Sequence, residues 1–241
     1  MAEVIVCADA AEIAQKAVEL VRDVAVQSIA ERGVFDFVLS GGSTPERLYK
    51  LLALPPYADS IAWNKTRVFM GDERFVRFAD PSSNWGMAKR TLLDIVPIPP
   101  ANLFPIPTDV PTPTEAAERY EATLAKLFPD TLPVFDLLLL GLGDDGHTAS
   151  LFPGKLSLTV LDKTAVATSP GVLPPPVDRI TLTFPVLNAA RRVLFLVAGK
   201  NKAEPLKTVL SGTASVNDYP AVGISPADGT LTFLIDEAAN A

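Results

Sequence analysis

The sequence predicts an α/β fold, in which a mostly parallel β-sheet carries helices on both faces. Three observations support this prediction. Short apolar runs alternate with segments of helical periodicity along the chain. Two of the runs, at 35–39 and 134–140, are almost continuously apolar, as expected for strands covered on both faces. Polar, glycine-rich sequence follows several strands, at the edge of a parallel sheet where ligands bind.

The first third of the chain repeats a strand–helix unit. Its predicted elements are, in order, a strand at 3–8, a helix at 10–32, a strand at 35–39 and a helix ending near 54. The first helix has an apolar stripe at helical spacing and stops at Gly33. For the second helix, Thr44 is the predicted N-cap and Pro45 the predicted first residue.

The same alternation continues to the C-terminus, with shorter strands and longer connections. The predicted elements are a strand at 66–70, a helix from Ser82 or Ser83 to Leu93, a helix at 114–128, strands at 134–140, 164–168, 179–183 and 193–198, a helix containing Lys202 and Lys207, and a strand at 231–235. The prolines between 96 and 113 indicate a rigid connection and not a linker between domains.

Composition limits the classes of partner. The 241 residues are 48% hydrophobic and 20% charged, which is typical of a globular protein. The net charge of −7 argues against a nucleic-acid partner or an anionic membrane surface, since both need a basic field. The single cysteine, Cys7, is compatible with a reducing compartment. Because no signal peptide or long apolar run occurs, we expect a cytoplasmic protein with no membrane partner.

The loop SGGSTP, residues 40–45, follows the strand at 35–39 and precedes a helix. Gly41 and Gly42 permit close approach of the backbone, and Ser43 and Thr44 offer hydroxyl groups beside the unpaired N–H groups of a helix N-terminus. These features suit an anion such as phosphate. An ordinary glycine turn followed by an N-cap explains the same residues, and the loop alone does not decide between the two.

The loop GLGDDGH follows the strand at 134–140 and contains the only histidine, His147. Its glycines match the dinucleotide-binding pattern, but Asp144 and Asp145 would repel a pyrophosphate and Pro153 interrupts the expected helix. A lone histidine is more often structural than catalytic. Here, however, it lies on a strand-end loop beside Asp145, the arrangement that a general base needs. No second histidine supports a metal site.

The sequence GDER after the strand at 66–70 places Asp72 and Arg74 at a third strand end. A surface ion-pair cluster is one interpretation of these charges. If Arg74 points inward, its guanidinium suits a carboxylate, a phosphate or a developing oxyanion. Arg179 and Lys202, each alone, would be solvated surface charges, but together with the serine loop they could neutralise a phosphate.

Taken together, four ordered motifs resemble the 6-phosphogluconolactonases, which belong to the wider glucosamine-6-phosphate isomerase superfamily. They are LSGGSTPERLY, MGDERFV with SSNWGMAKRTLL, LLLLGLGDDGHTASLFPG and RITLTFPVLNAARRVLFLVAGKNKAEPL, within a similarity that spans about residues 10–235. The resemblance implies a modified Rossmann-like fold, and we expect one domain over residues 1–241 and a monomer or weak homodimer. It also implies hydrolysis of 6-phospho-D-glucono-1,5-lactone, without a metal or other cofactor.

Roles for individual residues follow from the same resemblance. His147 would be the base that activates water, and Asp72 and Arg74 would line the lactone site. The phosphate would be held by Gly41, Gly42, Ser43, Thr44, Arg179 and Lys202. Either Asp145 or Asp72 would orient the imidazole, and the sequence leaves that choice open.

Two other functions were compared with this hypothesis. The related amino-sugar phosphate deaminases carry a glutamate five residues after the histidine, whereas this chain has Phe152, which transfers no proton. A non-catalytic sugar-phosphate sensor usually carries a DNA-binding helix-turn-helix, for which this chain has no room and no basic recognition helix. Both comparisons favour the lactonase.

Overall fold

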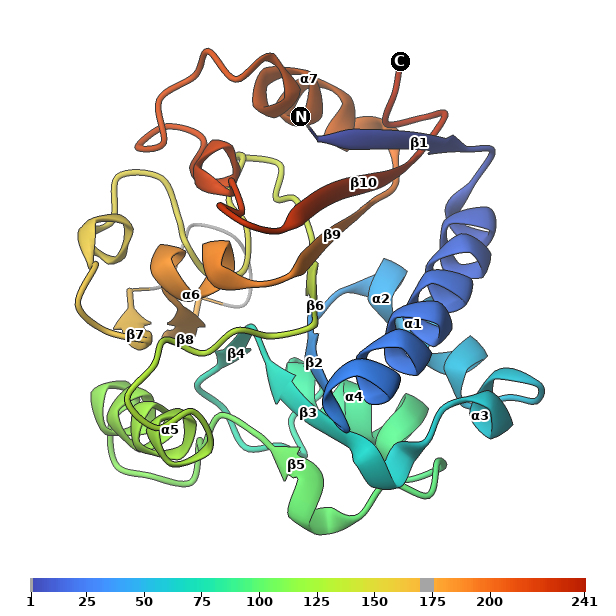
Figure 1. Cartoon of the computed structure of the whole chain (residues 1–241). Coiled ribbons are helices and arrows are strands. Elements are labelled where there is room, and N and C mark those ends of the chain that lie inside the picture. The colour runs from blue at the N-terminus through green and yellow to red at the C-terminus, as the bar shows by residue number, and fades with distance from the viewer. Residues whose placement is uncertain (1, 170–175) are drawn as a thin grey trace.

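A computed structural model describes residues 2–169 and 176–241, and in them a seven-stranded sheet runs through the molecule (Figure 1). Every pairing in this sheet is parallel, which confirms the predicted fold class. The strands in spatial order are β1 (Glu3–Cys7), β10 (Thr230–Asp236), β9 (Arg192–Val197), β6 (Leu137–Leu140), β2 (Phe35–Leu39), β3 (Thr66–Met70) and β5 (Leu103–Phe104). The first and last strands of the chain therefore pair at one edge of the sheet.

Helices cover both faces of this sheet. Figure 1 shows α1 and α2 on one side of the central strands and α5 and α6 on the other. The helices are α1 (Ala10–Arg32), α2 (Ser43–Leu52), α3 (Tyr57–Ser60), α4 (Asn84–Ala88), α5 (Pro113–Leu127), α6 (Phe184–Ala189) and α7 (Ala203–Ser211). The predicted ends of α1 are correct, because the Asp9 side chain caps its first turn and Gly33, at φ 79°, ends it. No helix among the described residues is long and apolar enough to cross a membrane.

A second, three-stranded sheet was not anticipated as a separate unit. It contains β4 (Asp72–Arg74), β8 (Arg179–Leu182) and β7 (Ala165–Thr168), paired antiparallel with β8 in the middle. The strands predicted at 164–168 and 179–183 exist but leave the main sheet. β4 follows β3 after Gly71, whose carbonyl accepts a hydrogen bond from the Leu182 N–H at 2.9 Å. This turn moves the GDER residues off the main sheet.

Several predicted elements differ from the structure in their bounds or helix type. Helix α2 begins at Ser43, so Gly42 and not Thr44 is the N-cap, and Pro45 is the third helical residue. Gly42 has φ 108°, a backbone conformation that a β-branched threonine disfavours. The strand predicted at 134–140 begins only at Leu137, and the helix predicted to run to Leu93 continues after α4 as a π-helix, Lys89–Leu93.

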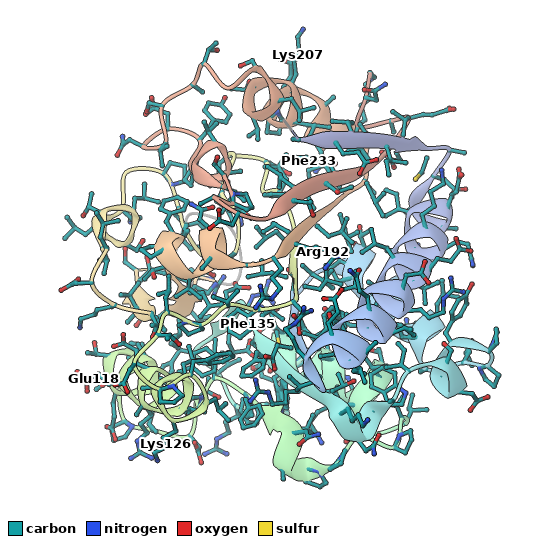
Figure 2. All side chains as sticks on the ribbon, viewed as in Figure 1. Glu118, Lys126, Phe135, Arg192, Lys207 and Phe233 are labelled. Atoms are coloured by element: carbon teal, nitrogen blue, oxygen red, sulfur yellow. The ribbon has the colours of Figure 1, made fainter. Side chains whose placement is uncertain are left out.

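Aromatic side chains fill the core beside the sheet and fix the strand ends. Phe135 and Phe233 are buried, whereas Glu118, Lys126 and Lys207 project from the surface (Figure 2). The buried Tyr49 of α2 donates its hydroxyl to the Ser40 carbonyl at 2.7 Å, and the buried Tyr120 of α5 donates to the Met70 carbonyl at 2.9 Å. Each tyrosine thus holds the chain at the point where a central strand ends. Burial raises the pKa of both phenols, so they remain hydrogen-bond donors.

Candidate active site

A cleft of about 420 Å³ lies beyond the carboxyl ends of the adjacent strands β9, β6, β2 and β3. Ligands of open α/β sheets bind where the strand order changes direction, and here it does so between the neighbouring strands β2 and β6. The residues that line it are Ser40, Gly41, Gly42, Ser43, Thr44, Pro45, Asp72, Arg74, Asn84, Gly141, Leu142, Gly143, Asp144, His147, Ala149, Leu196, Val197, Ala198, Asn201 and Lys202. The three strand-end loops predicted to converge therefore do so, and the Asn201–Lys202 turn after β9 joins them.

The loop after β2 presents Gly41 and the first turn of α2 to the cleft. The Ser40 N–H donates to the Tyr49 hydroxyl at 2.9 Å, which ties the loop to the helix that it starts. A Cβ on Gly41 would lie 2.0 Å from the Oδ1 atom of Asn84, so only glycine fits against that side chain. The exposed N-terminus of α2 leaves N–H groups available for an anion.

His147 lies in the cleft with Asp145 as its partner. The Nδ1 atom is 2.5 Å from Asp145 Oδ1, and the backbone N–H of His147 donates to the same oxygen at 3.1 Å. Burial by itself raises the pKa of Asp145, but the hydrogen bond and charge of His147 outweigh it, and the net pKa is lowered. Because a carboxylate only accepts hydrogen bonds, Nδ1 carries the hydrogen and Nε2 is the basic nitrogen.

The loop around His147 leaves the imidazole little freedom. The Gly143 N–H donates to the His147 carbonyl at 2.8 Å, and the Thr148 hydroxyl donates to the Gly141 carbonyl, also at 2.8 Å. Phe152 packs on the imidazole with ring centroids 4.7 Å apart. A phenyl ring therefore occupies the position five residues after the histidine, and it supports the imidazole through packing alone.

Asp72 is buried next to the histidine loop and has partners other than the imidazole. Its Oδ2 atom accepts a hydrogen bond from the Ser150 hydroxyl at 2.5 Å, and its Oδ1 atom accepts one from Asn84 Nδ2 at 3.3 Å. Of the two acids left open by the sequence, Asp145 is the one in contact with His147. Asp72 instead lines the cleft with a carboxylate that neutral donors hold in place.

Glu73 shows that GDER is not a surface ion-pair cluster. Its fully buried carboxylate accepts hydrogen bonds from the Arg74, Asn84 and Trp85 N–H groups, each at 2.7 Å, and from the Ser83 hydroxyl at 3.0 Å. These donors include the first turn of α4, whose positive end favours a carboxylate. Glu73 thereby fixes the loop that brings Asn84 into the cleft. Nothing in the sequence distinguished Glu73 or Asn84 from their polar neighbours.

The two predicted arginines occupy neighbouring positions on β4 and β8. Arg74 and Arg179 are directly paired in the second sheet. Arg74 lines the cleft and donates to the Ser82 carbonyl at 2.5 Å, whereas Arg179 is buried and donates to the Val177 carbonyl at 2.7 Å. Burial, and then the charge of Arg74, lower the pKa of Arg179. Arg179 therefore adds positive charge near the cleft without lining it.

Lys202 comes from the turn after β9 and lines the cleft. It is the last residue of a 3-10 turn, Lys200–Lys202, and not part of the predicted helix, which begins at Ala203. Its ammonium forms an ion pair with Asp144, and the Asn201 amide donates to the same Asp144 oxygen at 2.9 Å. The sequence had assigned no role to Asn201. Within residues 2–169 and 176–241, no histidine, cysteine or acidic side chains group as metal ligands.

Comparison with known proteins shows the family to which this sequence belongs. Residues 8–233 match the family described as glucosamine-6-phosphate isomerases/6-phosphogluconolactonase. The chain belongs to it. A 6-phosphogluconolactonase of Synechocystis sp. is 44% identical over 216 residues, which cover 88% of this chain and 86% of the relative. One of Nostoc sp. is 42% identical over 217 residues, covering 89% and 87%.

The three-dimensional comparison agrees with the sequence match. The solved structure of 6-phosphogluconolactonase from Trypanosoma brucei superposes with a TM-score of 0.89 at 30% sequence identity, covering 99% of this chain and 97% of that one. This member of the family thus shares its overall fold with the trypanosomal protein over nearly the whole length of both chains.

Proposed function

We propose that this protein is a 6-phosphogluconolactonase, which hydrolyses 6-phospho-D-glucono-1,5-lactone to 6-phospho-D-gluconate in the oxidative pentose phosphate pathway. The observation that carries the proposal is the His147–Asp145 pair in a cleft that also presents Arg74, Lys202 and a helix N-terminus. A general base and an anion-binding rim are what hydrolysis of a phosphorylated lactone requires. The relatives named above support the same activity.

The chemistry begins with water. Asp145 accepts the Nδ1 hydrogen of His147 and leaves Nε2 to take a proton from a water molecule as its oxygen attacks the lactone carbonyl carbon. Arg74 stabilises the negative charge that develops on the carbonyl oxygen. The ring C–O bond then breaks, and the protonated imidazole returns its proton to the departing ring oxygen. A δ-lactone is an activated ester, so no covalent nucleophile is needed.

Phosphate binding at the other end of the cleft positions the ring. The Gly41–Thr44 segment at the start of α2 and the Lys202 ammonium supply donors, and the buried charge of Arg179 adds attraction. Binding energy from this remote group holds the carbonyl carbon against the water. Asp72, fixed by Ser150, also lines the cleft and suits hydrogen bonds from the sugar hydroxyls.

Phe152 argues against the deaminase alternative. Opening an amino-sugar ring needs a proton-transfer group beside the histidine, whereas Phe152 covers the imidazole with a ring that has no exchangeable proton. The chain should therefore release no ammonia from glucosamine 6-phosphate. Measurable ammonia release would contradict the lactonase proposal directly.

His147→Ala tests the proposed base. The variant should abolish turnover, since general-base catalysis contributes roughly 10²–10⁴-fold, while the affinity for 6-phosphogluconate stays largely intact. The assay follows disappearance of freshly generated lactone, with spontaneous hydrolysis subtracted. A rate close to that of the unmodified protein would show that His147 is not the base.

Three further properties belong to the same proposal. We propose a single domain, because β1 and β10, near the two ends of the chain, pair in one sheet. We also propose a cytoplasmic enzyme, supported by a lone cysteine that is buried. A monomer or weak homodimer without a nucleic-acid partner is consistent with the acidic net charge of −7, and sedimentation at two protein concentrations tests the oligomeric state.

A further inference from the structure

Two consecutive acids in the histidine loop point to different partners. Asp145 contacts His147, whereas Asp144 lines the cleft and binds both Lys202 and Asn201. Asp144 plays no part in the mechanism described above. Its carboxylate nevertheless takes up the ammonium that the substrate phosphate is proposed to use.

We propose that Asp144 is an internal competitor of the substrate phosphate, a residue that sets how tightly the cleft binds anions. This inference rests on the proposed function, because it assumes that the phosphate binds at Lys202. The Asp144 carboxylate binds both Lys202 and Asn201, and an incoming phosphate must displace it from both.

The charges of the competing groups determine which ligands succeed. Asp144 contributes one negative charge, whereas a phosphate monoester carries about −1.5 to −2 at neutral pH. A monoanion that replaces Asp144 exchanges one charge for another and gains little. A phosphate carries more negative charge than the Asp144 carboxylate that it replaces, and it also reaches the N–H groups at the start of α2. The site thus favours phosphorylated ligands partly through the anion that they must displace.

The pair is suited to reversible displacement. The Asp144 side chain is half exposed, at 51% of its possible accessible area, and that of Lys202 retains 22%. An ion pair with this exposure is weak and is screened by salt, so it opens readily. After hydrolysis, Asp144 can pair with Lys202 again as the product leaves.

Asp144→Asn tests the competitor role, since it removes the charge and keeps the shape. The dissociation constant of inorganic phosphate, measured by calorimetry, should fall roughly three- to tenfold, because one exposed pair no longer competes and one repulsive charge is gone. The KM for the lactone should fall in parallel. The gain should shrink at 0.5 M NaCl, where the Debye length is only a few Å. A matched control is Asp228→Asn, which removes the same charge from an exposed position before β10.

Coupling to Lys202 separates this role from a merely structural one. Lys202→Ala should weaken phosphate binding, and adding Asp144→Asn to that variant should change it little, because the ammonium for which the carboxylate competes is gone. An Asp144→Asn variant with unchanged or weaker phosphate binding, or the same gain in both backgrounds, would overturn the inference.

The outcomes also separate this inference from the proposed function. If the unmodified protein does not hydrolyse the lactone, yet Asp144→Asn binds phosphate more tightly in a Lys202-dependent way, the activity is wrong and the competitor role stands. If the lactone is hydrolysed and Lys202→Ala leaves the phosphate affinity unchanged, the activity stands and the competitor role is wrong.

Discussion

Gly143→Ala should inactivate the enzyme with little effect on its stability. A Cβ at this position would lie 2.0 Å from His147 Nδ1, 2.2 Å from Cε1 and 2.7 Å from Asp145 Oδ1. Restoring an ordinary contact of 3.4 Å requires the imidazole to move by about 1.4 Å, and Phe152 packs against the ring. A misplacement of 1 Å costs on the order of 100-fold in rate, or about 2.7 kcal/mol in the activation barrier.

The assay compares kcat of the variant and the unmodified protein with freshly generated lactone, alongside thermal unfolding. We expect kcat to fall at least about 100-fold. Gly141→Ala is the matched control in the same loop, because its Cβ would meet no atom within 4 Å, and it should retain most of the activity. If Gly143→Ala kept more than about a tenth of the normal kcat, the position of the imidazole would not limit catalysis and the reasoning would fail.

Three more predictions concern the site and the sheet that supports it. Gly41→Ala should raise KM, because its Cβ would lie 2.0 Å from Asn84 Oδ1 and push this side chain out of place; steady-state kinetics measures the effect. Arg67→Met should destabilise the protein by about 3–5 kcal/mol, measured by urea unfolding. The substitution removes the guanidinium that donates to the buried Asp36 carboxylate at 2.5 and 2.6 Å. Adding Asp36→Asn should recover part of the lost stability. The pKa of Asp145 is lower in the folded protein than the ordinary aspartate value of about 4, so its ionised form stabilises the fold above that pH. This stabilisation is lost as the pH falls through the lower folded pKa. The difference in unfolding free energy between the unmodified protein and Asp145→Asn should therefore shrink below about pH 4.

Local sequence patterns predicted most of the main sheet. Apolar runs located β2, β3 and β9 within a residue or two, and the Asp9 and Gly33 caps defined α1. These features are local, because burial on both faces requires continuous apolar strands and helix ends require particular capping residues. The N-cap of α2 was misplaced because Gly42, at φ 108°, already turns the chain into the helix before Thr44.

The candidate site was predicted less completely than the fold. Loops at strand ends could be expected to meet, and the residues Gly41, Asp72, Arg74, His147 and Lys202 do line one cleft. Arg179 does not line it, because this residue lies on β8, which pairs with β4 in the second sheet, and its side chain is buried there. This separation follows from the antiparallel second sheet, whose strands are far apart in the chain and carry no local mark of their pairing.

By itself, the sequence determined the alternation of strands and helices, the glycine turn before the helix at SGGSTP and the proximity of Asp145 to His147. Each depends on neighbours within a few residues, where spacing fixes geometry. Only the tertiary structure decided that Asp72 is held by Ser150, that Glu73 binds the first turn of α4 and that Asp144 pairs with Lys202. The Asp72 and Asp144 contacts join segments that meet only when strands β3, β6 and β9 align in one sheet, and the Glu73 contact closes a loop with no local pattern that marks it.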